Sequence, residues 1–429
     1  MTRGSQTLPN PRSEYVSLPD NDFARLKFRI QAAIVRAVLR MANLILRVLT
    51  RILFRRPRRA RLDTVRRIAI YRVGNIGDIL VALPALQAIR GRFPQAYIVF
   101  ITSAGSANSI GARELLPTGI WYDELFRYDQ SDLSNWRGLL GLVRRARALN
   151  CQLFVELSNV LSTLATEVKT IAFANVIGSS YLVGTRVSEL RWFRRAQSLH
   201  LPSQNERDRL MSFIEEDLEL NRPGPVFLAA VGEDWVDVEN ALSTSLVPRS
   251  YIVIHPGCKH PLNQWPESRF AEVAKFITGQ GLTVVLTGSK AESAICANVA
   301  RDCEGHIADA SGLLSVSQLV LLLRNALLYI GNDTGPMHIA SAVGTPSISI
   351  FSARDYPFQW FPAGENDIIL RRDVPCSPCL AEVCPYGMKC LDLIQVDDVV
   401  RALDQQMQRL TMRAPALLGD SGWNGGTRG

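Results

Sequence analysis

Two loops of the sequence combine residue types that could transfer a proton or bind a phosphate. The first, YRVGNIGDILVALPAL at residues 71–86, has two glycines three apart followed by Asp78. It lacks the Gly-x-Gly-x-x-Gly spacing of a dinucleotide site and the Gly-Lys-Ser/Thr of a phosphate loop. Gly74 and Gly77 allow a sharp turn after an apolar run, and Asp78 then stands at the head of a helical stretch. Position alone makes this acid either a helix cap or a catalytic base.

The second loop, GNDTGPMHIA at residues 331–340, combines polar groups with a predicted helix start. Asp333 and Thr334 precede Gly335, a proline takes a first-turn position, and His338 falls on the first turn or two of the helix. Backbone amides at a helix start, with a hydroxyl and an imidazole, form a site for a diphosphate. The alternative is a capped helix with a histidine buried for packing.

A third loop, HPGCKHPLNQWP at residues 255–266, ends a predicted strand with Gly257 and offers Lys259. Its other candidate side chains are His255, His260 and Trp265. A lysine beside a glycine-terminated strand suits phosphate, although a solvated lysine on a Gly/Pro turn is equally ordinary.

Four of the eight cysteines are packed into CSPCLAEVCPYGMKC. They are Cys376, Cys379, Cys384 and Cys390. This spacing predicts a closed structural site for zinc or an iron–sulfur cluster, with disulfides or free thiols as the alternatives. The other four cysteines are scattered and indicate buried thiols of a cytosolic protein.

The positive charge of the chain is concentrated near its start. Residues 23–62 hold twelve Lys or Arg and no acid, and the remainder has a net charge of −4. This distribution argues against a nucleic-acid-binding body. Between residues 28 and 54 the chain is largely apolar, and its arginines repeat at helical spacing. They are Arg29, Arg36, Arg40, Arg47 and Arg51.

The basic segment favours a helix that lies on a membrane. Four arginines inside a membrane span would cost on the order of 10 kcal/mol, which disfavours a spanning helix. A basic amphipathic helix in the plane of an anionic interface avoids that cost. Packing on the body or on a second subunit is the alternative. The polar start lacks the apolar core of a signal peptide, so we expect a cytoplasmic protein, peripheral on the inner face of the cytoplasmic membrane.

After the basic segment, short β-branched runs alternate with helical patterns in two series. The runs lie at residues 66–73, 96–103, 123–129, 151–159 and 181–186, and then at 251–257, 282–289, 327–333 and 345–352. Such alternation predicts an α/β chain with two doubly wound, Rossmann-like domains facing a cleft. The expected divisions are a disordered tail at 1–22, a basic amphipathic helix at 23–62, a first Rossmann-like domain at 63–225, a linker at 226–250, a second Rossmann-like domain at 251–395 with the cysteine loop at 376–390, a closing helix at 396–412 and a disordered tail at 413–429.

Together these stretches resemble glycosyltransferase family nine, the ADP-heptose:lipopolysaccharide heptosyltransferases and their relatives. The resemblance runs from about residue 68 to 410 and rests on GDILVALPALQAIRGRFP, on NDTGPMHIASAVGTP, on the His-Pro-Gly turn before Trp-Pro, and on the Cys-x-Pro-Cys loop. It implies a GT-B fold and an inverting transfer with no cofactor for catalysis. The implied donor is a nucleotide-diphosphate sugar, ADP-heptose first, and the implied acceptor is a membrane-associated glycan or glycolipid such as lipopolysaccharide core.

The resemblance also assigns roles to residues. Asp78 would be the general base, and Glu292 resembles the family's ribose-binding acid. Asp333, Thr334, Gly335 and His338 would hold the donor's diphosphate and sugar. One departure is that Asn263 and Gln264 precede Trp265, where many members carry Lys or Arg; Lys259 or His260 would then reach in instead. A catalytically inactive nucleotide-sugar-binding scaffold at the membrane and a nucleotide-sugar epimerase are the alternatives.

Overall fold

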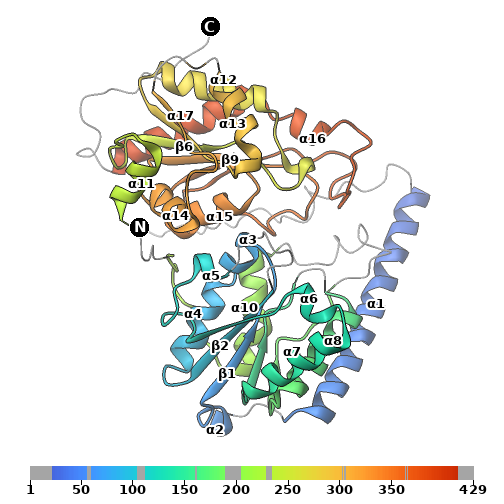
Figure 1. Cartoon of the computed structure of the whole chain (residues 1–429). Helices are drawn as coiled ribbons and strands as arrows, with labels where there is room; N and C mark the ends of the chain where they lie inside the picture. The colour runs from blue at the N-terminus through green and yellow to red at the C-terminus, as the bar shows by residue number, and fades with distance from the viewer. Residues whose placement is uncertain are drawn as a thin grey trace, which may run out of the picture.

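The computed structural model consists of two α/β domains, one above the other in Figure 1. It describes residues 22–55, 59–103, 112–159, 162–188, 204–228, 234–301, 303, 306–362, 364 and 366–413. The predicted tails fall almost wholly outside these residues: the first described helix begins at Asp22, and the last ends at Arg413.

The amino-terminal domain, lower in Figure 1, is built on a five-stranded parallel sheet of order β3-β2-β1-β4-β5. Its strands are β1 (Arg67–Tyr71), β2 (Tyr97–Thr102), β3 (Glu124–Arg127), β4 (Leu153–Glu156) and β5 (Tyr181–Val183). In register, Ile68 of β1 pairs with Ile98 of β2 and with Leu153 of β4. All five predicted strands of this series are therefore confirmed.

Helices cover both faces of this sheet. They are α2 (Arg59–Leu62), α3 (Ile76–Leu80), α4 (Leu83–Arg92), α5 (Ala112–Leu115), α6 (Gln130–Leu133), α7 (Trp136–Ala148), α8 (Leu164–Ile177) and α10 (Glu206–Leu218). Ile68 and Ile70 pack in one core with α4 and α10, whereas Ala69 packs in a second core with α7 and α8. Burial on both faces explains why these strands are continuously apolar.

The basic segment forms α1 (Asp22–Leu53), which lies along the outside of the amino-terminal domain beside α8 (Figure 1). Val35 is buried, and Ala42 and Leu46 pack in the core shared with α7 and α8. The Asn43 amide accepts from the Val187 backbone N–H at 3.0 Å and donates to the Val187 carbonyl at 3.0 Å. The predicted alternative of packing on the body therefore holds for one stripe of this helix.

The carboxyl-terminal domain has a six-stranded parallel sheet of order β11-β10-β9-β6-β7-β8. Its strands are β6 (Tyr251–His255), β7 (Thr283–Leu286), β8 (Ile307–Asp309), β9 (Leu328–Asn332), β10 (Ser347–Phe351) and β11 (Ile368–Arg371). The predicted central strands are confirmed, and the two edge strands β8 and β11 are additions.

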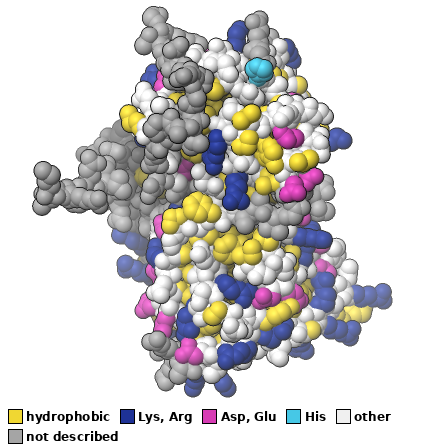
Figure 2. Space-filling view, turned by 90° about the vertical axis from the view of Figure 1, so that its left-hand side faces the viewer, with side chains coloured by type: hydrophobic (Ala, Val, Ile, Leu, Met, Phe, Trp, Pro, Cys, Tyr) yellow, Lys and Arg dark blue, Asp and Glu magenta, His cyan; other side chains and the backbone are white. Residues whose placement is uncertain are grey.

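The helices of this domain complete the second doubly wound unit. They are α11 (Trp235–Leu242), η2 (Pro261–Asn263), α12 (Glu267–Gly279), η3 (Lys290–Glu292), α13 (Ser293–Ala300), α14 (Val316–Arg324), α15 (Gly335–Ala342), α16 (Lys389–Asp392) and α17 (Val396–Arg413). The predicted linker contains α11, which packs on α14 and stacks Trp235 on Tyr251 at 6.3 Å. On the face shown in Figure 2, hydrophobic side chains gather at the junction between the domains.

Candidate active site

Asp78 lies in the first turn of α3, directly after the carboxyl end of β1. Its Oδ2 accepts from the Asn75 backbone N–H at 3.0 Å, which closes a capping box. The cap interpretation of this acid is therefore correct as local structure. A quarter of the side-chain surface remains exposed, and a carboxylate has lone pairs to spare beyond one cap bond. The cap does not prevent Asp78 from accepting a proton.

A buried arginine, Arg72, lies next to Asp78. Arg72 is fully buried, with a terminal nitrogen 3.5 Å from Asp78 Oδ1 and Nε donating to the Asp78 carbonyl at 3.0 Å. The same guanidinium lies 3.5 Å from Glu206 Oε1. Burial lowers the pKa of Arg72, and the negative charges of Glu206 and Asp78 oppose that shift. Arg72 thus fixes the catalytic candidate by contacts to both its side chain and its backbone.

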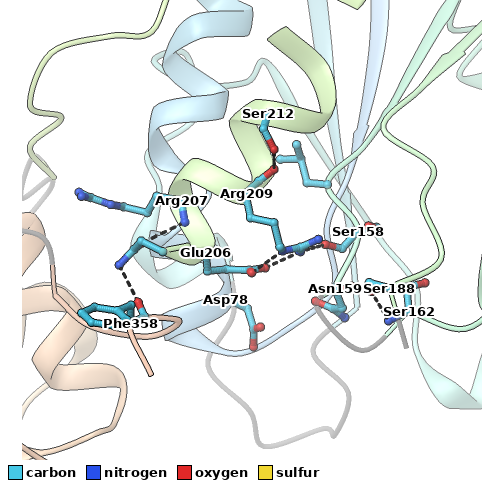
Figure 3. A network of polar contacts seen from close by, with 12 residues as sticks. Asp78, Ser158, Asn159, Ser162, Ser188, Glu206, Arg207, Arg209, Ser212 and Phe358 are labelled. Carbon is cyan, nitrogen blue, oxygen red and sulfur yellow. Dashed lines mark hydrogen bonds and ion pairs between the residues drawn. The ribbon is translucent and has the colours of Figure 1, made fainter. Parts of the chain in front are cut away.

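Glu206 and Arg209 of α10 complete this network (Figure 3). Arg209 donates to both Glu206 oxygens at 2.6 Å, and both side chains are buried. The start of α10 is also tied to the other domain, because the Glu206 N–H donates to the Gln359 carbonyl at 2.9 Å and the Asn205 amide donates to the Phe361 carbonyl at 2.7 Å. The network therefore links Asp78 to the junction between the domains.

Helices α3 and α15 meet across that junction, as Figure 1 shows. A Cβ atom at Gly77 would lie 2.8 Å from His338 Cδ2, and one at Gly335 would lie 3.0 Å from Ile76 Cβ. Gly77 was expected in the turn, but it lies within α3, where the close contact with His338 requires a glycine. Gly74 is the turn glycine: its φ is +155°, and a Cβ there would lie 2.2 Å from Asp78 Cβ.

His338 is buried at this contact, with its ring edge-on to Trp360 at 6.2 Å. Burial and, to a smaller extent, the positive charge of Arg207 together lower the pKa of His338 to about 4. The imidazole is accordingly neutral at pH 7.

The start of α15 presents Asp333 and Thr334, both half-buried. Thr334 is the N-cap residue, and its side chain makes no cap hydrogen bond. Burial raises the pKa of the Asp333 carboxyl well above its ordinary value; Asp355 adds to the rise, while Arg371 and Arg354 oppose it. A carboxyl of this kind tends to be neutral, and it would not repel a diphosphate.

Gly257 and Glu292 lie together at the end of β6. A Cβ at Gly257 would lie 2.2 Å from Glu292 Oε1, so a larger residue would displace this acid. The other Glu292 oxygen accepts from the Ser289 backbone N–H and hydroxyl, each at 2.7 Å. His255 is buried nearby, and burial lowers its pKa against the charge of Glu292.

Lys259 is exposed and reaches across the junction, where its Nζ donates to Asn75 Oδ1 at 3.3 Å. It therefore approaches the turn that carries Asp78. His260 instead lies 3.5 Å from Glu382. Asn263, two residues before Trp265, is buried and accepts from the Ser352 hydroxyl at 2.6 Å.

Trp265 belongs to the core and is not available to a ligand. It is fully buried, its indole N–H donates to the Ile394 carbonyl at 2.9 Å, and its backbone N–H donates to Asn332 Oδ1 at 3.0 Å. Buried Asn332 also donates to the carbonyls of Pro256 and Gly257 at 2.9 and 3.2 Å. It ties the His-Pro-Gly loop to the strand before α15.

The predicted structural metal site is not seen among the described residues. Cys376, Cys379, Cys384 and Cys390 are free thiols, and no group of three or more His, Cys, Asp or Glu among the described residues is arranged to hold a metal ion. The thiols are close enough to interact, since the other three add to the rise that burial causes in the pKa of Cys376. Hydrogen bonds order the loop instead: Arg354 Nε donates to the Ala381 carbonyl at 2.7 Å, and the Leu380 N–H to the Arg354 carbonyl at 3.0 Å.

Comparison with known proteins identifies the family. The model of glycosyltransferase family 9 (heptosyltransferase) matches residues 164–389, more than half of the chain. The chain belongs to glycosyltransferase family 9. Family 9 relatives include lipopolysaccharide heptosyltransferase 3 of Escherichia coli, 33% identical over 40% of this chain and 50% of the relative. The chain thus spans about half the length of the first curated relatives it matches.

A longer match covers three quarters of the chain. Lipopolysaccharide heptosyltransferase 1 of Pseudomonas aeruginosa is 24% identical over 75% of this chain and 88% of the relative. Among solved structures, a family 9 glycosyltransferase from Veillonella parvula superposes with a TM-score of 0.63 at 19% identity, covering 80% of this chain and 97% of that one. The E. coli ADP-heptose heptosyltransferase II gives 0.58 at 17% identity, covering 80% and 99%. The fold is therefore the GT-B fold of two parallel-sheet domains.

Proposed function

We propose that this family 9 chain is an inverting glycosyltransferase that moves a heptose or related sugar from a nucleotide-diphosphate donor, ADP-heptose first, to a membrane-associated glycan or glycolipid such as lipopolysaccharide core. The observation that carries this proposal is the contact of α3 with α15, which brings Asp78 of one domain to the helix start of the other. A proton acceptor and a diphosphate-binding helix start face each other there, as an inverting displacement requires.

In the proposed reaction Asp78 accepts the proton of the acceptor hydroxyl. That oxygen attacks the anomeric carbon of the donor from the face opposite the diphosphate, and the bond from this carbon to the diphosphate oxygen breaks. The nucleoside diphosphate leaves with the bonding electrons, and the configuration inverts. The N–H groups at the start of α15 would stabilise the negative charge that develops on the leaving diphosphate. This scheme needs no cofactor.

The donor would be held by groups on the carboxyl-terminal domain. Thr334, Gly335 and His338 offer a hydroxyl, backbone amides and a neutral imidazole, and Asp333 would be a neutral neighbour. Glu292 would bind ribose hydroxyls beside Gly257, and Lys259 would supply a cation near the diphosphate. Because Ile76 covers Gly335, donor entry would require α3 to move away from α15.

We further propose that α1 holds the enzyme on the cytoplasmic face of the membrane. Arg36, Arg40, Arg47 and Arg51 are exposed along one stripe of α1, beside a stripe of exposed large apolar side chains. The apolar stripe comprises Ile34, Val38, Met41, Ile45, Val48 and Ile52. None of the described helices is both long and apolar enough to cross a bilayer. At a membrane interface the apolar stripe would be buried at the acyl boundary, and the arginines would contact anionic headgroups.

The test of the reaction is Asp78→Asn in the full-length protein. Asn can still accept the cap hydrogen bond but cannot take a proton, so we expect acceptor-dependent ADP release to fall by roughly 10² to 10⁴-fold. Donor affinity, measured by calorimetry, should change by less than about twofold, because ADP-heptose contacts the other domain.

Asp237→Asn is the matched control. Asp237 occupies the same capping-box position at the start of α11, is exposed, and lies in the other domain. Turnover close to wild type in Asp78→Asn would reject Asp78 as the base. Equal loss of activity in both variants would show a capping effect rather than a catalytic one.

A further inference from the structure

A cavity of about 370 Å³ lies beside the turn that carries Asp78. It is at the carboxyl ends of β1 and β4, where open parallel α/β sheets bind ligands, and Val73 in its wall directly precedes Gly74. Its polar wall is supplied mainly by Tyr71, Tyr128, Glu156, Ser158, Asn159 and Ser162. The volume is at the lower end of the range of about 300–1,000 Å³ for small-molecule pockets, which suits one or two sugar rings.

Two buried polar atoms in this wall have no hydrogen-bond partner in the described part of the chain. They are Oγ of Ser158, a residue 4% exposed, and Oε2 of Glu156, a residue 2% exposed. Buried polar groups are normally paired, because an unpaired one forfeits its bonds to water. A bound molecule that carries hydroxyl groups would supply a partner for Ser158 and satisfy this wall.

The charge of the cavity wall indicates which kind of molecule it binds. Glu167 accepts from the Ser162 hydroxyl and from the Arg186 backbone N–H, so it is the better stabilised carboxylate of an adjacent pair. Burial and the charge of Glu167 raise the pKa of Glu156 well above its ordinary value, so that this acid keeps its proton.

No Lys or Arg is among the described residues that line the cavity. Arg72 and Arg209 lie behind the wall, but they donate to the carbonyls of Leu157 and Ser158 and contact Glu206. A phosphate or carboxylate would need free cations in the wall, whereas a neutral sugar needs hydroxyl and amide groups. The wall offers hydroxyl and amide groups.

We propose that this cavity binds an uncharged, hydroxyl-bearing sugar of the acceptor, and that Ser158 and Tyr128 help to set this specificity. The inference rests on the proposed function, because the nucleophilic hydroxyl of that sugar must reach Asp78. Arg72 connects the two places: it donates to the Ser158 carbonyl at 3.1 Å and lies 3.5 Å from Asp78.

The specificity is tested with two acceptors that share one lipid and one glycan. In one the terminal sugar is neutral, and in the other it carries a phosphate monoester. We expect the full-length protein to use the neutral acceptor with a KM at least about tenfold lower, since a dianion would enter a wall without free cations. An equal or lower KM for the phosphorylated acceptor would overturn the proposal.

The residues are tested with Ser158→Ala and Tyr128→Phe. Each removes one hydroxyl, so we expect the acceptor KM to rise roughly threefold to tenfold while kcat and the donor Kd stay near wild type. Tyr97→Phe, at the amino-terminal end of β2 and so at the opposite end of the parallel strands, is the control and should leave the acceptor KM unchanged. An unchanged acceptor KM in both cavity variants would overturn the assignment.

A donor-free measurement separates this proposal from the proposed function. Saturation-transfer NMR with the neutral glycan reports binding without turnover. Suppose that no nucleotide sugar is turned over, but that wild-type protein binds the glycan several-fold more tightly than the Ser158→Ala variant does. The cavity assignment then stands and the transferase proposal fails. If transfer occurs but neither cavity variant weakens glycan binding, the reverse holds.

Discussion

Two acids and two arginines at the carboxyl end of β1 form one electrostatic unit. Glu206 lies between Arg209, which binds it through two bonds, and Arg72, which also faces Asp78. A buried ion pair of this kind costs desolvation, and its clearest benefit is a defined geometry. We infer that Glu206 positions Arg72, and through it Asp78, without touching the substrate.

Glu206→Gln should therefore destabilise the fold by about 3 to 5 kcal/mol, because it leaves two buried guanidinium groups without their shared anion. Chemical denaturation measures this change in the free energy of unfolding. Glu215→Gln is the matched control on the same helix: Glu215 pairs with Arg222 at 2.7 Å in an exposed position, so its loss should cost less than about 1 kcal/mol. Similar values for the two variants would contradict a stabilising role for the buried unit.

The sequence identified Asp78 as either cap or base, and the structure retains both possibilities in one side chain. It could not identify Arg72, Glu206 or Arg209, because a charged residue on a strand end or an acidic helix is ordinarily solvated. The one available signal was an arginine closing an otherwise apolar strand. Trp265 is the opposite case. The sequence offered it as a candidate site residue because it lies in a loop, but its side chain is fully buried in the core.

At the scale of elements, long apolar runs were predictable and short edges were not. The central strands, such as β6 and β9, are buried along their whole length, which gives runs of mainly apolar sequence. β8 and β11 are short edge strands with partly exposed side chains, so their pattern is weak. The helix α11 was missed because the surrounding prolines and glycines indicated a linker.

The contact between α3 and α15 has a predictable dependence on pH. His338 has a pKa of about 4 in the folded chain and roughly 6.5 when unfolded, so below pH 6.5 the unfolded chain binds more protons. The resulting loss of stability begins as pH falls through 6.5 and is complete near pH 4. Between pH 7.5 and 5 it should amount to about 2 kcal/mol.

His338→Gln should lack this component, so its free energy of unfolding should fall about 2 kcal/mol less than that of wild type over the same pH interval. Denaturant titrations at both pH values measure the difference. His306→Gln, which changes an exposed histidine of the same domain, should follow wild type. Parallel behaviour of wild type and His338→Gln would mean that His338 is not held neutral at this contact.

At the scale of the whole molecule, α1 belongs to two surfaces at once. With roughly 100° of turn per residue, the buried Val35, Ala42 and Leu46 share one side of the helix, the exposed apolar stripe lies on a second side, and the arginines lie on a third. Lys and Arg also gather more densely on the lower, amino-terminal half of the face in Figure 2. If α1 binds an anionic membrane as proposed, this arrangement would bring the amino-terminal domain, and not the carboxyl-terminal domain, against that surface.

Removing α1 would be a poor test of membrane binding, because it would uncover the core around Leu46 and break the Asn43 contacts with Val187. Met41→Glu with Ile45→Glu is sharper, since both side chains are at least half exposed. We expect this pair to reduce co-sedimentation with phosphatidylglycerol vesicles at least tenfold, because two charges would enter the apolar layer. Val236→Glu, on the exposed side of α11, is the control. Wild-type binding that persists in the double variant, or is equal on phosphatidylcholine vesicles, would assign the exposed stripe to a protein partner instead.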